Sequence, residues 1–338
     1  MIDKIVFYVD DVDVEKLEKT FLKYAKTSKE ELDIIALDKR GVSVWGATLN
    51  ETMEIEVKLV KVRNKEEKRW VLSGHGSLHK FKRKENYSTF TANDAQQAIS
   101  DLGKRLDISL NKIIITSIEI GVNIEVSKEP MRYINMVHLY KKRPFIYMRP
   151  LKNSPHLRGK LCQYTDYIIK FYDKTFEARH PLSVEKKTLI LSNILRYEVE
   201  LKSGKYSAMG FKNIKDSTFT AEHLLHIRFY SRFARILRNV FEKIVLRDLG
   251  KNHAGKSFEE IKNYIFVTSD TYDLYRSFIE EYRLDDKEGV KEYRAVKKLK
   301  KSLEKEFDLL KETENVLELK SKFAETINIV HDTRLYSK

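Results

Sequence analysis

Lys112-Ile-Ile-Ile-Thr-Ser-Ile-Glu-Ile-Gly-Val-Asn-Ile-Glu-Val126 is the clearest strand in the sequence, and it sets the expected fold. From Ser117 onward the odd positions are polar or glycine, and the even positions are isoleucine or valine. Side chains alternate across a strand, so one face is predicted to be buried and the other polar. This pattern is typical of an antiparallel sheet that is covered on one side only.

The rest of the N-terminal part reads as further strands and a few helices. Strands are expected at 3–9, 42–48, 54–63, 69–82 with an interruption at Gly74-His-Gly76, 166–173 and 194–202. A hairpin turn at Leu49-Asn-Glu-Thr52 would join the strands 42–48 and 54–63. Helices are expected at 13–26, with Asp13 as cap, from Thr91 to Leu106, with Asp94 in a capping-box position, and after Pro130.

After about residue 205 the periodicity becomes helical, over 220–249 and from 269 to the end. We therefore predict the α+β class. Residues 1–205 would form a domain with a mainly antiparallel sheet and helices on one face. Residues 206–338 would form a helical C-terminal domain.

Composition narrows the class of partner. The chain has 338 residues, a net charge of +14 and 34% charged residues, which favours a polyanion such as nucleic acid. The alternative is a charge spread evenly for solubility. The single cysteine, Cys162, excludes an internal disulfide and a cysteine-rich zinc site. The sequence contains no apolar run near the ~20 residues that span a membrane, so a cytoplasmic protein without a membrane partner is expected.

Two polar-faced strands carry the candidate chemistry. They read Asp166-Tyr-Ile-Ile-Lys-Phe-Tyr-Asp-Lys174 and Ile194-Leu-Arg-Tyr-Glu-Val-Glu-Leu-Lys202. Alternation places Lys170, Tyr172 and Lys174 on one face of the first strand. It places Arg196, Glu198 and Glu200 on one face of the second.

Tyr172 between two lysines suits phosphate-ester chemistry. A phenol can attack phosphorus, and the cations of Lys170 and Lys174 can hold the phosphate or lower the phenol pKa. Alternatively, Tyr172 is an ordinary strand aromatic and the lysines are solvated. Tyr164 is the alternative nucleophile in the same segment, because Tyr167 alternates onto the other face.

Glu119, Glu198 and His79 are the candidate metal ligands, since carboxylates with an imidazole suit Mg²⁺ or Mn²⁺. Such an ion would polarise the scissile phosphate. The carboxylates could instead be exposed, or form a salt bridge with Arg196. His75 is a weaker candidate, because four residues of strand separate it from His79 by about 13 Å.

Two stretches, from Lys80 to Tyr87 and from Tyr140 to Arg149, interleave cations with aromatic residues and are candidates for binding nucleic acid. Solvated charges beside core aromatics are the competing interpretation. Together with Arg196, the predicted contacts are Lys80, Lys82, Arg83, Lys141, Lys142 and Arg143.

Four short segments resemble the phage and plasmid rolling-circle replication initiators of the gene II/X type, known from filamentous phages, and more distantly the staphylococcal plasmid initiators. Tyr172-Asp-Lys174 followed by Leu195-Arg-Tyr-Glu-Val-Glu-Leu201 resembles the paired "YDK … RxEvxL" signature. Ser77-Leu-His-Lys-Phe81, leading to Asn86-Tyr-Ser-Thr-Phe90, and Ser117-Ile-Glu-Ile-Gly-Val-Asn123 resemble two earlier segments of that group. The match covers roughly residues 70 to 205.

The resemblance implies an HUH-endonuclease-like fold and a site-specific, metal-dependent endonuclease and strand transferase. Tyr172 is the position that matches the tyrosine that becomes linked to the 5′-phosphate of nicked DNA. The implied partner is single-stranded or supercoiled origin DNA. The C-terminal helices would position DNA, contact a host helicase or other replication protein, or mediate self-association. Many such initiators hold metal with two histidines one residue apart, and here only His79 is present in the matching segment.

Two other functions stay open at the level of sequence. One is a nucleic-acid-binding protein without nuclease activity. The other is a metal-dependent hydrolytic nuclease, which would cleave without a protein–DNA adduct.

Overall fold

The computed structural model describes residues 1–24, 36–37, 43–49, 52–61, 68–148, 158–179, 192–202, 219–248, 257, 259, 262 and 313–331. Within these ranges, ten strands form one antiparallel sheet in the order β2-β3-β4-β5-β1-β6-β12-β11-β10-β9. Their bounds are β1 Ile2–Asp10, β2 Ala36–Leu37, β3 Ser43–Leu49, β4 Met53–Lys61, β5 Lys68–Ser77, β6 Ile114–Val126, β9 Ile146–Tyr147, β10 Gly159–Gln163, β11 Tyr167–Asp173 and β12 Asn193–Lys202. The predicted α+β class with a mainly antiparallel sheet is confirmed.

A smaller sheet and the helices complete the described fold. The second sheet has the order β13-β7-β8, from β7 Val137–Tyr140, β8 Arg143–Pro144 and β13 Ile244–Leu246. The α-helices are α1 Val14–Tyr24, α3 Leu78–Arg83, α4 Ala92–Leu106, α5 Pro130–Met136, α6 Lys174–Arg179, α7 Ile227–Phe241 and α11 Glu314–His331. Two 3₁₀ segments, Leu110–Lys112 and Ala221–Leu225, complete the set.

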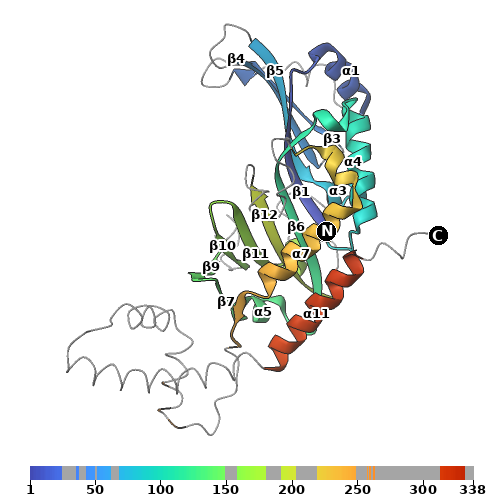
Figure 1. The fold of residues 1–338 in the computed structure, drawn as a ribbon. Helices are drawn as coiled ribbons and strands as arrows, with labels where there is room; N and C mark the ends of the chain where they lie inside the picture. The colour runs from blue at the N-terminus through green and yellow to red at the C-terminus, as the bar shows by residue number, and fades with distance from the viewer. Residues whose placement is uncertain are drawn as a thin grey trace, which may run out of the picture.

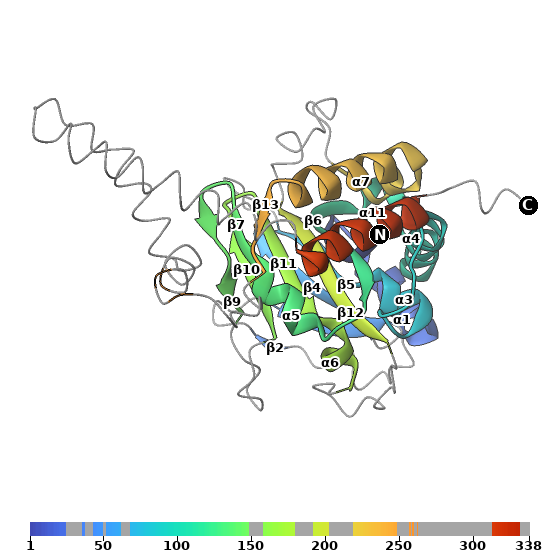
Figure 2. The ribbon, with the colours of Figure 1, turned by 90° about the horizontal axis from the view of Figure 1, so that it is seen from below.

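The helices lie mainly along one side of the sheet. Figure 1 shows α4, α7 and α11 on that side, and Figure 2 shows α6 on the other side of the strands from α7 and α11. The even positions of β6 from Ile118 to Val126 are all buried, as the alternation predicts. Tyr197 of β12 also points into this core, with its ring centroid 5.6 Å from those of both Phe241 and Phe323.

Several local predictions agree with the structure. The Asp13 side chain accepts a bond from Lys16 N at 3.0 Å and so caps α1. Thr91 and Asp94 form the reciprocal capping box of α4. The hairpin turn after β3 is closed by Thr52 N donating to Leu49 O at 3.2 Å.

The predicted interruption at Gly74-His-Gly76 is wrong. Strand β5 runs through both glycines, because each makes room for a close neighbour. A Cβ at Gly74 would lie 2.4 Å from the Phe7 ring, and one at Gly76 would lie 2.4 Å from the Thr52 carbonyl oxygen. The strand ends instead at Ser77, whose hydroxyl accepts a bond from Lys80 N at 3.1 Å and caps α3.

Strand β1 carries a bulge at Asp3. Ile2 pairs with Ile120 and Lys4 pairs with Glu119, so Asp3 is an additional residue with no partner opposite it on β6. A second register shift lies between Val6 and Phe7, where β6 has the additional residue. The first bulge turns Asp3 toward the polar strand faces described below.

The described helices that follow residue 205 share the core of the sheet. Phe241 of α7 stacks on Phe323 of α11 with 3.9 Å between ring centroids, and both contact Tyr197. Phe229 and Phe233 are buried in the same cluster. These helices therefore do not form a separate core, and the domain boundary between 205 and 206 stays a prediction. The charge-laced stretch 291–312 lies outside the described residues.

No helix among the described residues is long and apolar enough to cross a membrane.

Candidate functional site

The three strands that carry the candidate acids and the candidate tyrosine are neighbours in the middle of the sheet. Strand β12 lies between β6 and β11, and the antiparallel register pairs Tyr172 with Arg196 and Lys170 with Glu198. The register between β12 and β6 pairs Glu200 with Glu119. The polar faces predicted separately from the sequence therefore form one surface.

Glu198 is the centre of this group. Its Oε1 accepts a bond of 2.9 Å from the Tyr172 hydroxyl and one of 2.8 Å from Arg196 Nε. The side chain is buried and rests over Gly121 of β6. A Cβ at Gly121 would lie 2.6 Å from Glu198 Cγ, so the missing side chain makes room for the carboxylate.

Arg196 is a buried structural cation and not the exposed nucleic-acid contact that the sequence suggested. Only 4% of the residue is exposed. Its two terminal nitrogens donate to Asp3 Oδ2 and to Asn123 Oδ1, each at 2.9 Å. Burial by itself raises the pKa of Asp3, but Arg196, with smaller contributions from Lys174 and Ser77, lowers that pKa to about 2.

Lys170 is held by carboxylates and does not reach the phenol. Its ammonium lies 2.6 Å from Glu119 Oε1 and 2.9 Å from Glu200 Oε2. Burial lowers the pKa of this lysine, and Glu119 and Glu198 outweigh that effect and raise it. The proposed role for Lys170 beside Tyr172 has no support in these contacts.

Glu119 of β6 and Glu198 of β12 are neighbouring buried carboxyl groups. Burial, followed by the neighbouring charge of Glu198, raises the pKa of Glu119 to about 9. Two such neighbouring buried carboxyl groups do not both ionise readily, and the Lys170 ammonium offsets this effect only in part.

The phenol of Tyr172 is harder to ionise than expected. Burial and then the negative charges of Glu198 and Glu177 raise its pKa well above the usual range. Lys174 is the first residue of α6 and not the end of a strand, and its ammonium lies 5.7 Å from the Tyr172 ring centroid. The ammonium bonds to Glu177 at 3.0 Å, so the prediction that flanking lysines lower the phenol pKa is wrong.

His79 is not part of this group. It lies on α3 and not on a strand, stacked on Phe90 with 4.4 Å between centroids. Its Nε2 is 3.2 Å from Ser88 Oγ and 3.6 Å from Glu85 Oε1. Among the described residues, no group of three or more His, Cys, Asp or Glu side chains is arranged to hold a metal. The predicted set of Glu119, Glu198 and His79 is therefore wrong as a set.

The two carboxylates still fit a hard divalent cation. Mg²⁺ commonly takes only one or two protein carboxylates and completes its shell with water and substrate phosphate.

The alternative tyrosine is placed away from the acids. Tyr164 lies in the turn between β10 and β11, at the other end of β11 from Tyr172. Its hydroxyl donates to the Tyr140 carbonyl at 2.9 Å, and its ring stacks on Tyr167. Burial raises the pKa of Tyr164.

The predicted nucleic-acid contacts divide into paired and exposed side chains. Lys82 bonds to Asp101 at 2.9 Å, and Arg83 bonds to Asp94 at 2.9 Å. Lys141 and Arg143 lie over the Tyr164 ring at 5.7 and 4.5 Å. Lys142 is exposed, and Lys80 on α3 is half-buried. The described contacts do not place these cations beside Tyr172.

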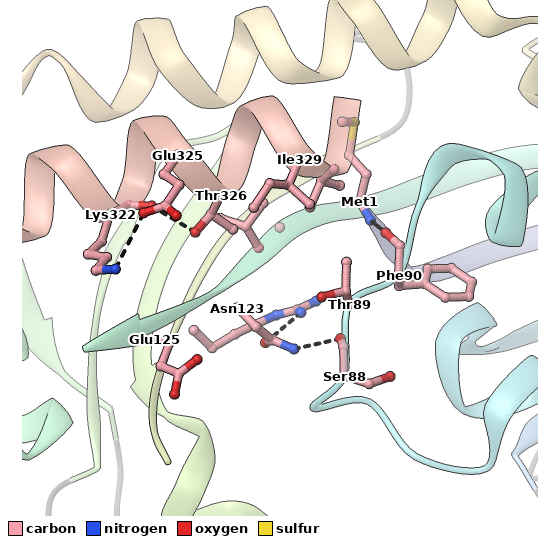
Figure 3. A pocket seen from close by; sticks show the side chains of 14 residues that line it. Met1, Ser88, Thr89, Phe90, Asn123, Glu125, Lys322, Glu325, Thr326 and Ile329 are labelled. Atoms are coloured by element: carbon pink, nitrogen blue, oxygen red, sulfur yellow. Dashed lines mark hydrogen bonds and ion pairs between the residues drawn. The ribbon is translucent and has the colours of Figure 1, made fainter. Parts of the chain in front are cut away.

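A small pocket of about 180 Å³ is lined in part by Arg196. Figure 3 shows it between α11, which contributes Thr326 and Ile329, and the segment that carries Ser88. Asn123 also lines the pocket, and its amide donates to the Tyr87 carbonyl at 2.8 Å and the Ser88 carbonyl at 3.2 Å. These bonds fix the segment after α3 against the end of β6.

Sequence reasoning missed Asp3 and the role of Gly121. Asp3 interrupts an apolar run at the start of a strand, and that signal was present. Its partner Arg196 is 193 residues away, which no local pattern reveals.

No protein-family model matches this chain, and no curated protein matches it in sequence. Among solved structures, it is similar to a rolling circle replication initiator protein from Geobacillus stearothermophilus, with a TM-score of 0.38 and 13% identity over 77% of this chain and 89% of the other. It is also similar to the di-domain ARO/CYC protein StfQ of the steffimycin biosynthetic pathway, with a TM-score of 0.17 and 8% identity over 71% of this chain and 98% of the other. Likenesses of this size carry no argument about function.

Proposed function

We propose that the protein nicks and rejoins origin DNA through Tyr172 and so initiates rolling-circle replication of a phage or plasmid. The observation that carries this proposal is the 2.9 Å hydrogen bond from the Tyr172 hydroxyl to Glu198. It supplies a proton acceptor for a phenol that lies in the segment resembling the initiators. The resemblance of four ordered segments and the net charge of +14 add support.

The reaction is a transesterification. The Tyr172 oxygen attacks phosphorus while its proton passes to Glu198, and the bond between phosphorus and the 3′ oxygen breaks. The 3′ oxygen takes a proton from solvent, and the 5′-phosphate stays on the tyrosine. Attack by a 3′-hydroxyl on that phosphotyrosine rejoins DNA without ATP. Because the phenol pKa is raised, the acceptor is needed at the moment of attack.

Glu119 and Glu198 are the proposed holders of Mg²⁺ or Mn²⁺. When bound, the ion would polarise the scissile phosphate. Glu119→Gln and Glu198→Gln keep the side-chain size and remove the charge, so both should raise the Mn²⁺ concentration required for nicking. Unchanged activity at low Mn²⁺ in both variants would remove them from the proposal.

The adduct assay tests the nucleophile. Protein and single-stranded origin DNA are incubated with Mn²⁺, and a band of raised mass is sought on a denaturing gel. Tyr172→Phe should abolish that band and leave DNA affinity within about threefold, because the hydroxyl reacts but contributes little to binding. Tyr164→Phe is the matched control and should keep the band.

The same assay separates the rivals. A full-strength adduct in Tyr172→Phe would contradict the assignment. Cleavage without any adduct, equal in wild type and Tyr172→Phe, would indicate a hydrolytic nuclease.

A nucleic-acid-binding protein without nuclease activity is the second candidate. The observation that favours it is that each of these carboxyl groups is already bonded to a side-chain cation, Glu119 and Glu200 to Lys170, and Glu198 to Arg196. It predicts DNA binding without covalent product at any Mn²⁺ concentration.

The remaining proposals concern partners. Affinity for single-stranded DNA should fall with salt, with a log–log slope of about −0.7 per phosphate contact. The segment after residue 205 is proposed to position DNA, contact a host helicase or mediate self-association. The reaction is proposed to take place in the cytoplasm.

A further inference from the structure

Of the aromatic residues between Tyr140 and Tyr147, some are buried and one is exposed. Tyr140 and Phe145 are core residues, at 3% and 7% exposed. Tyr147 is 44% exposed, and it lies on β9, the edge strand of the described sheet. Tyr147 is therefore the aromatic residue of this stretch that a ligand can reach.

The Tyr147 ring is held in place by two neighbours. Its hydroxyl donates to Asn135 Oδ1 at 2.9 Å. Lys160, opposite Tyr147 on β10, lies with its ammonium 4.9 Å from the ring centroid. A ring fixed in this way loses little conformational freedom when a flat ligand stacks on it.

The ring borders a pocket that carries cations. The pocket has a volume of about 750 Å³, within the usual range of ligand pockets, and is lined by Tyr147 and Asn135 among others. Its charged lining residues are the cations Lys128, Arg132 and Lys160 and the acids Glu129 and Asp248. Arg132 is exposed, and its side chain makes no hydrogen bond or ion pair with any residue that the structure describes. An exposed aromatic ring beside an arginine suits an unpaired base with its phosphate.

The position of β9 relates this pocket to Tyr172. Gly159 of β10 pairs with Tyr172, and Met148, next to Tyr147, donates its amide to the Gly159 carbonyl at 2.8 Å. Two strand spacings, about 10 Å, separate the edge from the tyrosine. Tyr147 shares its sheet face with Lys160 and Phe171, the face opposite Tyr172, so a strand of DNA would reach it by passing around the edge.

We infer that Tyr147 and Arg132 form a binding site for one unpaired nucleotide of single-stranded DNA, with the base stacked on Tyr147 and its phosphate against Arg132. The inference rests on the proposed function for the identity of the strand. It adds a contact that the motif segments do not contain.

The test measures the binding of fluorescein-labelled oligothymidylate by anisotropy, with every variant in a Tyr172→Phe background so that no covalent product forms. Tyr147→Leu keeps an apolar side chain and removes the flat ring. It should weaken binding about 5- to 150-fold, which is the range that stacking of one base supplies. Tyr147→Phe is the matched control and should bind within about twofold of the parent, because the ring remains.

A second probe separates stacking from charge. On an abasic oligonucleotide with the same phosphates, Tyr147→Leu should have no effect, whereas Arg132→Gln should weaken both probes equally. Equal affinity of Tyr147→Leu and its parent for oligothymidylate would overturn the inference, and so would an equal loss on the abasic probe.

These outcomes are distinct from those of the adduct assay. Binding that depends on Tyr147 without any adduct in the wild type would keep this site and overturn the nicking function. If the wild type forms the adduct but the affinity for oligothymidylate does not depend on Tyr147, the nicking function stands and this site is overturned.

Discussion

Tyr172 and Arg196 donate to the same atom, Oε1 of Glu198, at 2.9 and 2.8 Å. The guanidinium holds this oxygen in position for the phenol. The candidate nucleophile and the buried cation are therefore coupled through one carboxylate, and a change at Arg196 should reach both stability and reactivity.

Arg196→Gln should strongly destabilise the protein. It leaves Asp3 and Glu198 buried without their cation, and breaking a buried pair in this way costs about 3 to 5 kcal/mol. Urea unfolding gives the change in the free energy of unfolding. Lys142→Gln, which removes an exposed cation, is the control and should change it by less than about 0.5 kcal/mol. Similar stabilities of the two variants, with a larger loss of DNA affinity in Arg196→Gln, would restore Arg196 as a DNA contact.

The stability of the metal-free protein should depend on pH through Glu119. Burial and the charge of Glu198 raise the pKa of Glu119 from its ordinary value of 4.5, which it has in the unfolded chain, to about 9 in the folded protein. Between these two values the native state holds a proton that the unfolded chain releases. The stabilisation is complete below pH 4.5 and is lost as the pH rises through about 9. The slope is at most about 1.4 kcal/mol per pH unit for one proton.

Glu119→Gln isolates this effect, since an amide does not titrate. The free energy of unfolding, measured in EDTA across the same pH window, should fall more steeply in the wild type than in the variant. Parallel curves would show that Glu119 is ionised at neutral pH.

Gly121→Ala should displace Glu198. The added Cβ would lie 2.6 Å from the Tyr197 carbonyl oxygen as well as from Glu198 Cγ, and backbone cannot move aside cheaply. We expect a loss of about 1 to 3 kcal/mol in unfolding and a loss of adduct formation. Gly103→Ala is a matched control, because its Cβ would meet chiefly the end of the Leu110 side chain, and the helix gains an alanine. Equal losses in both variants would mean that Gly121 has no special relation to Glu198.

Phe323→Ala should show that α11 belongs to the core. Phe323 is 4% exposed and stacks on Phe241, and truncating a buried phenylalanine costs about 3 to 5 kcal/mol. Leu317→Ala, on the same helix but 53% exposed, should cost little. Thermal unfolding compares the two. A Phe323→Ala protein as stable as the wild type would support an independent unit after residue 205, and a fragment of residues 1–210 would then be expected to fold.

The sequence predicted the strands around the candidate site because their alternation is strong. Strands β6, β11 and β12 lie where the sequence predicted them, and their polar faces meet. Alternation, however, predicts only which face of the sheet a side chain points to, and not whether that side chain is exposed to solvent. Glu119 and Arg196 point to the predicted side and are nevertheless buried. Lys170 bonds to Glu119, and Arg196 bonds to Asp3 and Asn123.

The errors had one local cause, a helix cap, and otherwise came from residues whose neighbours are distant in the sequence. His79 followed a strand pattern, but Ser77 caps a helix there. Glycines at 74 and 76 indicated a break, although they accommodate Phe7 and Thr52. Strand β13 was hidden in a helical periodicity, and it forms because β7 offers an open edge.

The bulge in β1 places Asp3 outside the regular alternation of the core residues of that strand. Ile2 and Ile5 are three positions apart and both fully buried on the same face, which regular alternation forbids and the additional residue permits. A chain lacking Asp3 would bring the two isoleucines into ordinary alternation, so the core pattern would survive while Arg196 lost an anchor. Asp3 is thus an inserted residue with respect to the core pattern of β1. It adds one negative charge to the site at a single extra position, and the core pattern of the first strand does not depend on that residue.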